Sequence, residues 1–450
     1  MKNRKAVSRR KFLGTAGAAG VAGTLGFSSF LASCARDKNQ KNVPASEKLD
    51  QAPDGEVLKA GLVGCGNRGT GAAFDFLNAG PNLQITALAD VFDDQVQLCR
   101  GKLKKQKNVD IPDNMCFSGF DGYKNVIDSG VDIVLLATPP HFRPEHLEAC
   151  VLAKKHVFME KPAAVDPVGI RSIIGSAKKA EAIGLTIIGG TQRRHQRDYI
   201  ETYRHVQMGA IGDVVAANGY WLQNHVWYRT RQDEWNDMEY MIRNWNNFRW
   251  LCGDHFLDTH VHNIDIINWF SGKHPETALG GGARHRRLTG DQWDFFSVDF
   301  NYGLGVHSHS MSRQIDNCAN ATMEHIRGTE GYTNCQNTIF YPDGTIKWKY
   351  QYPLDANGNE TKTPKVSAYV QEHIDMVAAI RNNEPIVEAE DLALSTLTAI
   401  MGREAAYTGK LITWDEINKS SMRMGPSEYV MGPVDMEIET PVPGTAHGQF

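Results

Sequence analysis

Three residues with side chains suited to acid–base chemistry stand out in the sequence: Lys161, Asp258 and His262. Oxidising a secondary alcohol requires a base that takes the hydroxyl proton as hydride leaves the carbon, and a histidine with a pKa near the working pH suits that task. We therefore assign His262 as the base. Lys161 is expected to hydrogen-bond the same oxygen and to stabilise the developing alkoxide. Asp258 precedes His262 by four residues, so on one helix both would share a face, and the carboxylate would orient the imidazole or bind a neighbouring hydroxyl.

Taken alone, Asp258 and His262 have a plainer interpretation, in which one caps a helix and the other is a packed histidine. A dinucleotide fingerprint nearer the N-terminus favours the catalytic interpretation. The apolar run 57–63 leads directly into Gly64-Cys65-Gly66-Asn67-Arg68-Gly69, which is the pattern G-x-G-x-x-G after a predicted strand. The first glycine permits the tight turn, the second lets the backbone approach a pyrophosphate, and the third lets the next helix, 70–78, pack with its N-terminus toward the phosphates.

Asp90 supports the same assignment. It ends a second apolar run, 84–89, at the distance beyond the glycines where a carboxylate hydrogen-bonds the adenosine ribose hydroxyls. A 2′-phosphate would be repelled there, so the sequence predicts NAD rather than NADP. The alternative is an α/β domain with a glycine-rich turn and no dinucleotide.

The elements that must position these residues follow from the apolar runs. Runs at 131–137, 156–159 and 185–188 alternate with helical segments at 93–105, 144–154 and 167–183, which predicts a Rossmann domain over 56–189. Because ligands bind at the carboxyl ends of parallel strands, the segments that follow two of these runs are expected to line the cofactor crevice. The residues concerned are Thr138, Pro139, His141, Glu160 and Lys161, together with Asn67 and Arg68 of the glycine turn.

Through the glycine turn, Glu160-Lys161-Pro162 and Asp258-Thr259-His260-Val261-His262, the chain resembles the glucose–fructose oxidoreductase, inositol dehydrogenase and rhizopine-catabolism (Gfo/Idh/MocA) family. The resemblance extends from residue 57 to about residue 415. It implies an α/β fold: an N-terminal Rossmann domain, then a C-terminal α/β domain at 190–420 with a large, mostly antiparallel open sheet. It also implies that Lys161 lies near nicotinamide and substrate, that Asp258 and His262 supply the other catalytic groups, and that Gln192 lies near the nicotinamide.

Two residues depart from the family pattern. Many relatives have glycine where this chain has His260, and histidine where it has Arg143. We therefore expect the shape of the active site and the substrate contacts to differ from those of many relatives. Relatives commonly associate through the exposed face of the second sheet, so a homo-oligomer is expected as well.

Substrate contacts are predicted at Arg194, Trp245, His260 and His307. Five of the nine tryptophans lie between residues 221 and 250 among arginines, a mixture that suits sugars, although the same residues could form a core or an oligomer interface. Arg194 belongs to the charged run 192–195, whose alternative is a solvated surface. His307 and His309 alternate on a predicted strand, so they would share a face and line the pocket with His260. We predict no metal, because unpatterned histidines are more often hydrogen-bonded structural groups.

The first residues have the character of an export signal. Ser8-Arg9-Arg10-Lys11-Phe12-Leu13 is followed by a Gly/Ala-rich stretch ending at Leu31-Ala32-Ser33-Cys34, which predicts twin-arginine export of a periplasmic protein over 1–34. Cys34 would be acylated and anchor a lipoprotein to the membrane, unless the signal is simply cleaved. Residues 35–55 are predicted to form a linker, and 421–450 an extended C-terminal tail or an arm reaching a neighbouring subunit.

The net charge and the cysteine spacing indicate which partners and sites are not expected. The net charge is −4, with no basic field that would hold a polyanion, so nucleic acid is not expected as a partner. The cysteines other than Cys34 have no C-x-x-C spacing, so neither a disulfide framework nor a thiolate zinc site is expected.

Three functions remain open from the sequence. The first is an NAD-dependent dehydrogenase, with a tightly bound cofactor, that oxidises a secondary hydroxyl of a sugar or glycoside, such as that at C3. The second is a redox-neutral NAD-dependent glycosidase of the α-N-acetylgalactosaminidase type, a branch that lacks the lysine found here at position 161. The third is a non-catalytic sugar-binding lipoprotein.

Overall fold

The computed structural model describes residues 48–436 and 438–445. The predicted signal, with Cys34, and most of the predicted linker lie outside these residues. No helix among the described residues is long and apolar enough to cross a membrane.

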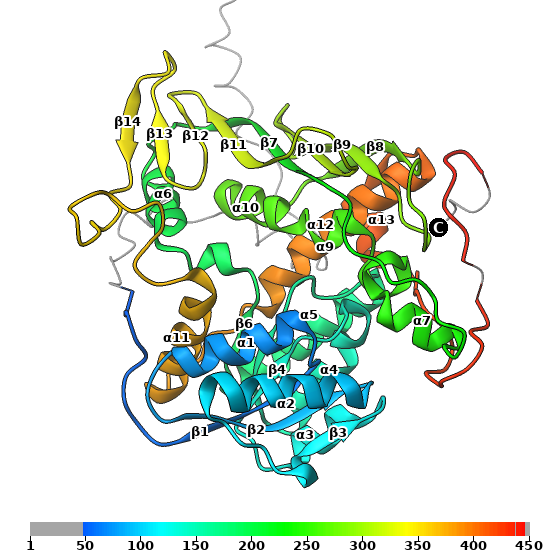
Figure 1. The fold of residues 1–450 in the computed structure, drawn as a ribbon. Coiled ribbons are helices and arrows are strands. Elements are labelled where there is room, and N and C mark those ends of the chain that lie inside the picture. Colours follow the sequence, from blue (N-terminus) through cyan, green and yellow to red (C-terminus); the bar gives the residue numbers. More distant parts are fainter. Residues whose placement is uncertain (1–47, 437, 446–450) are drawn as a thin grey trace, which may run out of the picture. The chain divides into compact units, whose positions relative to one another are not determined.

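The first sheet is parallel throughout, with strand order β3-β2-β1-β4-β5-β6 (Figure 1). The strands are β1 (Leu58–Val63), β2 (Leu83–Asp90), β3 (Cys116–Ser118), β4 (Ile133–Leu136), β5 (His156–Met159) and β6 (Ile187–Gly189). The intervening helices are α1 (Asn67–Asn78), α2 (Asp93–Lys107), α3 (Gly122–Asp128), α4 (Arg143–Leu152) and α5 (Pro167–Ala182). All four β4 residues are buried because helices cover both faces of the sheet. The strand order reverses between β1 and β4, where a doubly wound sheet opens its ligand crevice.

The second sheet has nine strands in the order β14-β13-β12-β11-β7-β10-β9-β8-β15, and only the pairing of β7 with β10 is parallel. The strands are β7 (Val214–Gln223), β8 (Thr277–Ala283), β9 (Phe295–Asn301), β10 (His307–Gln314), β11 (Ala321–Gly328), β12 (Tyr332–Thr333), β13 (Thr338–Phe340), β14 (Ile346–Lys349) and β15 (Ile412–Thr413). This mostly antiparallel sheet beside a Rossmann sheet confirms the predicted fold class.

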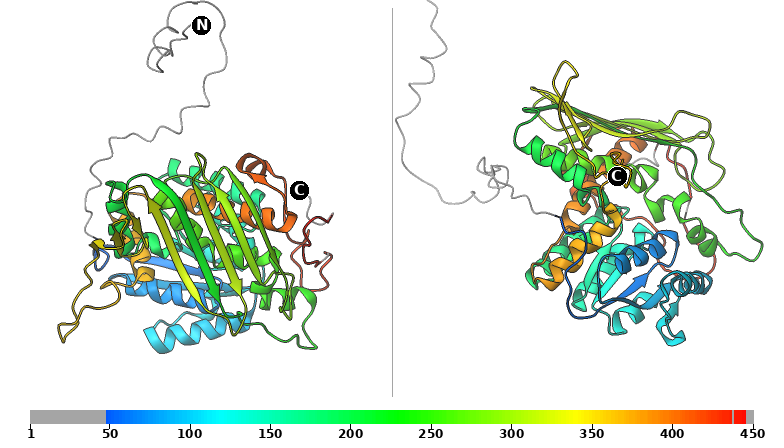
Figure 2. Two further views of the ribbon diagram at one scale, coloured as in Figure 1. Left: turned by 90° about the horizontal axis from the view of Figure 1, so that it is seen from above. Right: turned by 60° about the vertical axis from the view of Figure 1, so that its left-hand side comes forward.

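The nine-stranded sheet has one covered face and one open face. Helices α10 (Val261–Ser271) and α12 (Ala389–Thr408) pack on the covered face, and the left view of Figure 2 shows the open face without a helix over it. Side chains alternate accordingly, so Phe296, Val298 and Phe300 are buried while Phe295 is exposed.

Helices from the end of the chain return to the Rossmann sheet. Helix α11 (Ala368–Arg381) packs on α1 and β6, and α12 packs on α5. Just before α12, the amide of Ile187 in β6 donates to Ile386 O at 2.7 Å. Helix α12 ends at Gly409, whose φ of 69° is the left-handed conformation expected of a glycine cap. One apolar core therefore runs between the two sheets, and the predicted domain boundaries stay predictions.

The remaining helices follow β6 in the chain: α6 (Arg197–Gln207), α7 (Asp237–Arg243), α8 (Arg249–Cys252), α9 (His255–Asp258) and α13 (Trp414–Lys419). Short 3-10 turns at Pro140–Phe142, Gln192–Arg194 and Trp245–Asn247 carry several of the predicted site residues. The described residues after 420 form no helix or strand, and they lie against their own chain.

Candidate active site and cofactor site

The glycine turn between β1 and α1 has the shape that a dinucleotide needs. Gly64 has a φ of 97°, and a Cβ on Gly69 would stand 1.8 Å from Gly64 O, so both positions require glycine. A Cβ on Gly66 would meet nothing within 4 Å, which leaves its backbone open to a ligand. Helix α1 begins at Asn67 with its N-terminus at this turn. The residues present therefore fit a pyrophosphate.

Asp90 ends β2 beside that turn. Its carboxylate accepts from the amide of Cys65 at 2.7 Å and from that of Phe92 at 3.1 Å, one bond to each oxygen. Burial raises the pKa of Asp90, while the two amides oppose the rise. Each oxygen keeps a lone pair, so the carboxylate is held in place and can still accept ribose hydroxyls.

Arg68 points to carboxylates of its own chain. Its Nε lies 2.5 Å from Glu160 Oε1, its Nη1 lies 3.0 Å from Asp75 Oδ2, and its guanidinium covers the ring of Tyr369 at 4.8 Å. Gln192 Nε2 donates to the hydroxyl of Tyr369 at 3.4 Å. The structure therefore brings Arg68 together with Glu160 and Gln192. The guanidinium of Arg68 pairs directly with the carboxylate of Glu160.

His141 lies in the 3-10 turn after β4 and Thr138-Pro139. Its Nε2 lies 2.7 Å from the hydroxyl of Tyr429. Its Nδ1 is buried and has no hydrogen-bond partner among the described residues. Burial, helped by Arg423, lowers the pKa of His141 to about 3, so the imidazole is neutral. Thr138 Oγ1 is turned toward His146 Nδ1 at 3.3 Å.

Lys161, directly after β5, reaches the end of α9. Its ammonium donates to the main-chain carbonyl of Asp258 and lies 3.6 Å from Asp258 Oδ1. Asn246 Nδ2 donates to the other carboxylate oxygen of Asp258 at 2.8 Å. Arg143 is buried and donates to Pro162 O, so it supports the loop that carries Lys161. The structure thus brings Lys161 and Asp258 together across 97 residues of sequence.

His262 lies close by, but the expectation of one helix carrying Asp258 and His262 is wrong. Helix α9 ends at Asp258 and α10 begins at Val261, with a turn at Thr259 and His260 between them. The break leaves Asp258 O available to Lys161. The plainer interpretation, an Asp258 that caps a helix, is not what the structure shows, because the cap of α9 is Asp254.

The surroundings of His262 keep its imidazole uncharged. Its ring stacks on Trp221 at 5.7 Å, and no described residue hydrogen-bonds its imidazole. Burial lowers the pKa of His262 well below its usual value, and the charges of Lys161 and Arg193 lower it further. The imidazole is therefore neutral at physiological pH and has a free nitrogen with which to accept a proton.

The predicted substrate contacts are scattered. Arg194 forms a buried ion pair with Asp265, with Nη2 2.8 Å from Oδ1. His260 is buried on the sheet side of the turn, with Nδ1 3.2 Å from Asn263 Oδ1. Trp245 is half-buried beside Asn246 and packs on an apolar cluster around Phe248 and Trp250. None of these contacts involves Lys161 or His262.

His307 does not line the pocket. It is exposed on the open face of β10 and lies 2.7 Å from Asp299, whereas the residues of β10 that face the helices are Ser308, Ser310 and Ser312. His307 and His309 do share a face, as their alternation predicts, but it is the outer one. Alternation alone cannot say which face of a strand is covered.

Sequence reasoning missed Asn246 as a support of the site, and it marked Arg143 only as a departure from the family pattern. Asn246 lies within the tryptophan-rich segment, where nothing in its spacing marks it. The tryptophans of that segment divide among different environments: Trp221 stacks on His262, Trp250 is buried and Trp227 is 49% exposed. No three His, Cys, Asp or Glu side chains gather as metal ligands within the part of the chain that the structure describes.

Comparison with known proteins bears on the Rossmann part of the chain. Residues 58–188 match the model of the Gfo/Idh/MocA oxidoreductase family with an NAD-binding Rossmann fold. This stretch of the chain is therefore similar to the NAD-binding domain of that family.

Two relatives and one solved structure show which kinds of protein the chain is similar to. The chain is 27% identical over 226 residues to myo-inositol 2-dehydrogenase of Thermotoga maritima, which covers 50% of this chain and 58% of the relative. It is 30% identical over 185 residues to a glycosyl hydrolase family 109 protein of Phocaeicola vulgatus, covering 38% and 32%. The match thus covers less than two thirds of either relative's own length, 58% of the first and 32% of the second. An aldose–aldose oxidoreductase of Caulobacter crescentus shares the fold, with a TM-score of 0.62, 19% identity, and 79% and 99% of the two chains covered.

Proposed function

We propose that this protein oxidises a secondary hydroxyl of a sugar, cyclitol or glycoside with NAD as hydride acceptor. The observation that carries the proposal is the meeting of Lys161, Asp258 and His262 beside the carboxyl edge of the Rossmann sheet. The names of the relatives, which act on inositol and on aldoses, support polyhydroxylated substrates.

Each residue of the site has its own role in the proposed oxidation. Bound NAD, held at the glycine turn and Asp90, would supply the hydride acceptor. Neutral His262 takes the hydroxyl proton, and Lys161 hydrogen-bonds the same oxygen and favours its negative charge. Asp258, fixed by Asn246, holds the ammonium of Lys161 in place. Trp221 offers an aromatic face beside His262, on which the apolar face of a ring can pack.

Tight cofactor binding and export also belong to the proposal. The twin-arginine pattern and Cys34 support a periplasmic, membrane-anchored protein. Free NAD is scarce there, so a protein that keeps its cofactor would have the advantage. Mass spectrometry of protein purified without added cofactor tests this: we expect bound NAD, and protein that carries none would contradict tight binding.

The activity is tested with purified protein, NAD and a panel of cyclitols, monosaccharides and glycosides. We expect NADH to form with at least one of them, and a matching ketone to appear in the mass spectrum. A Lys161→Ala variant should form neither.

A redox-neutral glycosidase is the second candidate. The similarity to glycosyl hydrolase family 109 proteins favours it, whereas the retained Lys161 favours the dehydrogenase. Cleavage of a glycosidic bond with the cofactor back in its oxidised form would decide for the glycosidase.

A further inference from the structure

The C-terminal tail, defined here as residues 421–436 and 438–442, packs beside α7 and α8. It packs on an apolar cluster drawn from three parts of the chain. Phe142 comes from the Rossmann domain, Trp250 from α8, and Met424, Tyr429 and Met436 from the tail itself. The amide of Met238 in α7 donates to Gly432 O at 3.1 Å. The tail therefore joins parts of the protein that hold the two halves of the site.

One end of the tail is fitted around His141. The hydroxyl of Tyr429 lies 2.7 Å from His141 Nε2, and its ring packs edge-on against Phe142 at 5.3 Å. Gly425 has a φ of 104°, and a Cβ there would stand 2.5 Å from His141 Cε1 and 3.3 Å from the ring of Trp250. The amide of Met424 donates to Asp166 at 2.9 Å. Only a glycine lets the tail lie this close to the imidazole.

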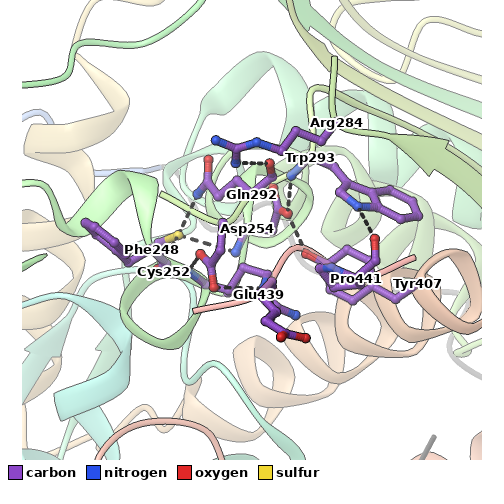
Figure 3. Close-up of polar contacts among 12 residues, drawn as sticks. Phe248, Cys252, Asp254, Arg284, Gln292, Trp293, Tyr407, Glu439 and Pro441 are labelled. Atoms are coloured by element: carbon purple, nitrogen blue, oxygen red, sulfur yellow. Dashed lines mark hydrogen bonds and ion pairs between the residues drawn. The ribbon is translucent and has the colours of Figure 1, made fainter. Parts of the chain in front are cut away.

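The other end reaches a buried cluster around Asp254, shown in Figure 3. Pro441 O accepts from the indole of Trp293 at 3.0 Å, and Glu439 O accepts from Arg249 at 2.7 Å. The amide of Trp293 in turn donates to Asp254 Oδ2 at 2.9 Å, and the hydroxyl of Tyr407 donates to the same oxygen at 2.5 Å.

Asp254 begins the short helix that carries Asp258. It has a φ of 75°, a conformation that costs a non-glycine residue energy, and its carboxylate caps α9 through the amide of His255 at 2.6 Å. The contacts from Trp293 and Tyr407 hold Asp254 in that conformation. The tail thus connects, through Trp293, to the start of the helix whose last residue contacts Lys161.

We propose that the tail positions the cofactor side of the active site, with Gly425 and Tyr429 acting as positioning residues for His141. His141 Nδ1 is buried without a partner among the described residues, in the turn after β4, the strand that pairs with β1 and its glycine turn. An imidazole fixed through Nε2 would therefore have a polar atom left for a bound dinucleotide. The inference rests on the proposed function, because it gives the tail a role in binding NAD. In this proposal the tail completes the site of its own subunit and is not an arm that reaches a neighbouring subunit.

The test compares three full-length variants. Gly425→Ala adds a Cβ that must push the tail off His141, and Tyr429→Phe keeps the ring but removes the hydroxyl. Val430→Ala is the control, because Val430 lies in the same segment and is 61% exposed. We measure the NADH dissociation constant by fluorescence, the melting temperature, and hydrogen exchange of residues 138–146.

We expect Gly425→Ala to raise the NADH dissociation constant about tenfold and Tyr429→Phe to raise it a few fold, since 1.4 kcal/mol corresponds to a factor of ten. Residues 138–146 should exchange faster in both variants and as in the wild type in Val430→Ala. Tyr429→Phe should melt close to the wild type, which separates positioning from loss of fold. Unchanged NADH binding and exchange in both variants would overturn the inference. A wild type that binds no NADH would instead refute the proposed function, while faster exchange in the variants would still show that the tail holds His141.

Discussion

The glycine turn and the Lys161 site face the same crevice, yet they are built in different ways. The turn is made by residues 64–69 and Asp90, and it presents mainly backbone to a ligand. The Lys161 site is made by side chains from β5, α9 and α10, and each is held by a residue that is distant in sequence. Cofactor binding should therefore survive changes that abolish catalysis, and each region can be broken without the other.

The largest effect is expected from Lys161→Ala. Loss of the ammonium removes the group that stabilises the alkoxide, so kcat/KM should fall by about a thousandfold, within the range for acid–base groups. The NADH dissociation constant should stay within about twofold, because the glycine turn is untouched. Lys178→Ala, an exposed lysine of α5, is the control and should match the wild type in both measurements. A Lys161→Ala variant that keeps its turnover would place the chemistry elsewhere.

His195 follows the 3-10 turn after β6 and lies between Asp375 at 2.7 Å and Glu388 at 3.2 Å. Burial opposes its charge, but Glu388 and Asp375 raise the pKa of His195 to about 10. Removing it in His195→Gln takes a charged partner from two partly buried carboxylates, of which Asp375 still has Lys48, and should cost about 1.5–3 kcal/mol of unfolding free energy.

The pH dependence has a definite sign. Since the folded pKa lies above the unfolded value, the stabilisation by His195 is fully present below about pH 6.5 and declines as pH rises toward 10. Urea denaturation at pH 6 and pH 9 measures it. The gap between wild type and His195→Gln should be larger at pH 6, and a gap that grows with pH would contradict the charged imidazole.

Asp90→Ala breaks the cofactor region alone. The ribose hydroxyls would lose the carboxylate that accepts their hydrogen bonds. The NAD dissociation constant should therefore rise about 10- to 100-fold, as expected for hydrogen bonds to a charged group. At saturating NAD, kcat should stay close to that of the wild type. Asp128→Ala, which removes an exposed carboxylate at the end of α3, is the matched control. Equal NAD affinity in Asp90→Ala and wild type would contradict the cofactor assignment.

Asn246→Ala tests how the Lys161 site is held. Asp258 would lose its 2.8 Å hydrogen bond and be less well placed to orient the ammonium of Lys161. We expect kcat to fall about tenfold with unchanged NADH binding, since one hydrogen bond to a carboxylate is lost. Steady-state kinetics beside a fluorescence titration gives both values. A loss of NADH affinity without a loss of kcat would mean that Asn246 acts on cofactor binding and not on catalysis.

His307→Ala should do the least. His307 lies on the open face of the second sheet, paired with Asp299, so kcat/KM should stay within about twofold of the wild type. His262→Ala, measured alongside, should lose about a hundredfold or more. A large effect of His307→Ala would mean that the open face takes part in catalysis.

The difference between the two regions also explains what the sequence could predict. The Rossmann order and the glycine turn are local patterns, because each follows from an apolar run, the glycines and one carboxylate at a set distance. Lys161 and His262 were found because their chemistry and the family resemblance point to them. The contact of Lys161 with Asp258 across the fold needed the structure.

The errors have physical causes. The helix expected to join Asp258 and His262 is broken at Thr259 and His260, and no glycine or proline marks the break. His307 alternates as a strand residue should, but period two does not identify the covered face. Asn246 and Arg143 act through single hydrogen bonds to distant residues, and such contacts leave no pattern in the sequence.

The central claim is tested most directly by incubating the purified protein with NAD and the panel of cyclitols, sugars and glycosides, following nicotinamide absorbance while mass spectrometry identifies the product. The account predicts that NADH accumulates together with a ketone of one substrate, and that Lys161→Ala abolishes both. Glycosidic cleavage that leaves the cofactor oxidised, or no reduction of NAD with any compound, would contradict it.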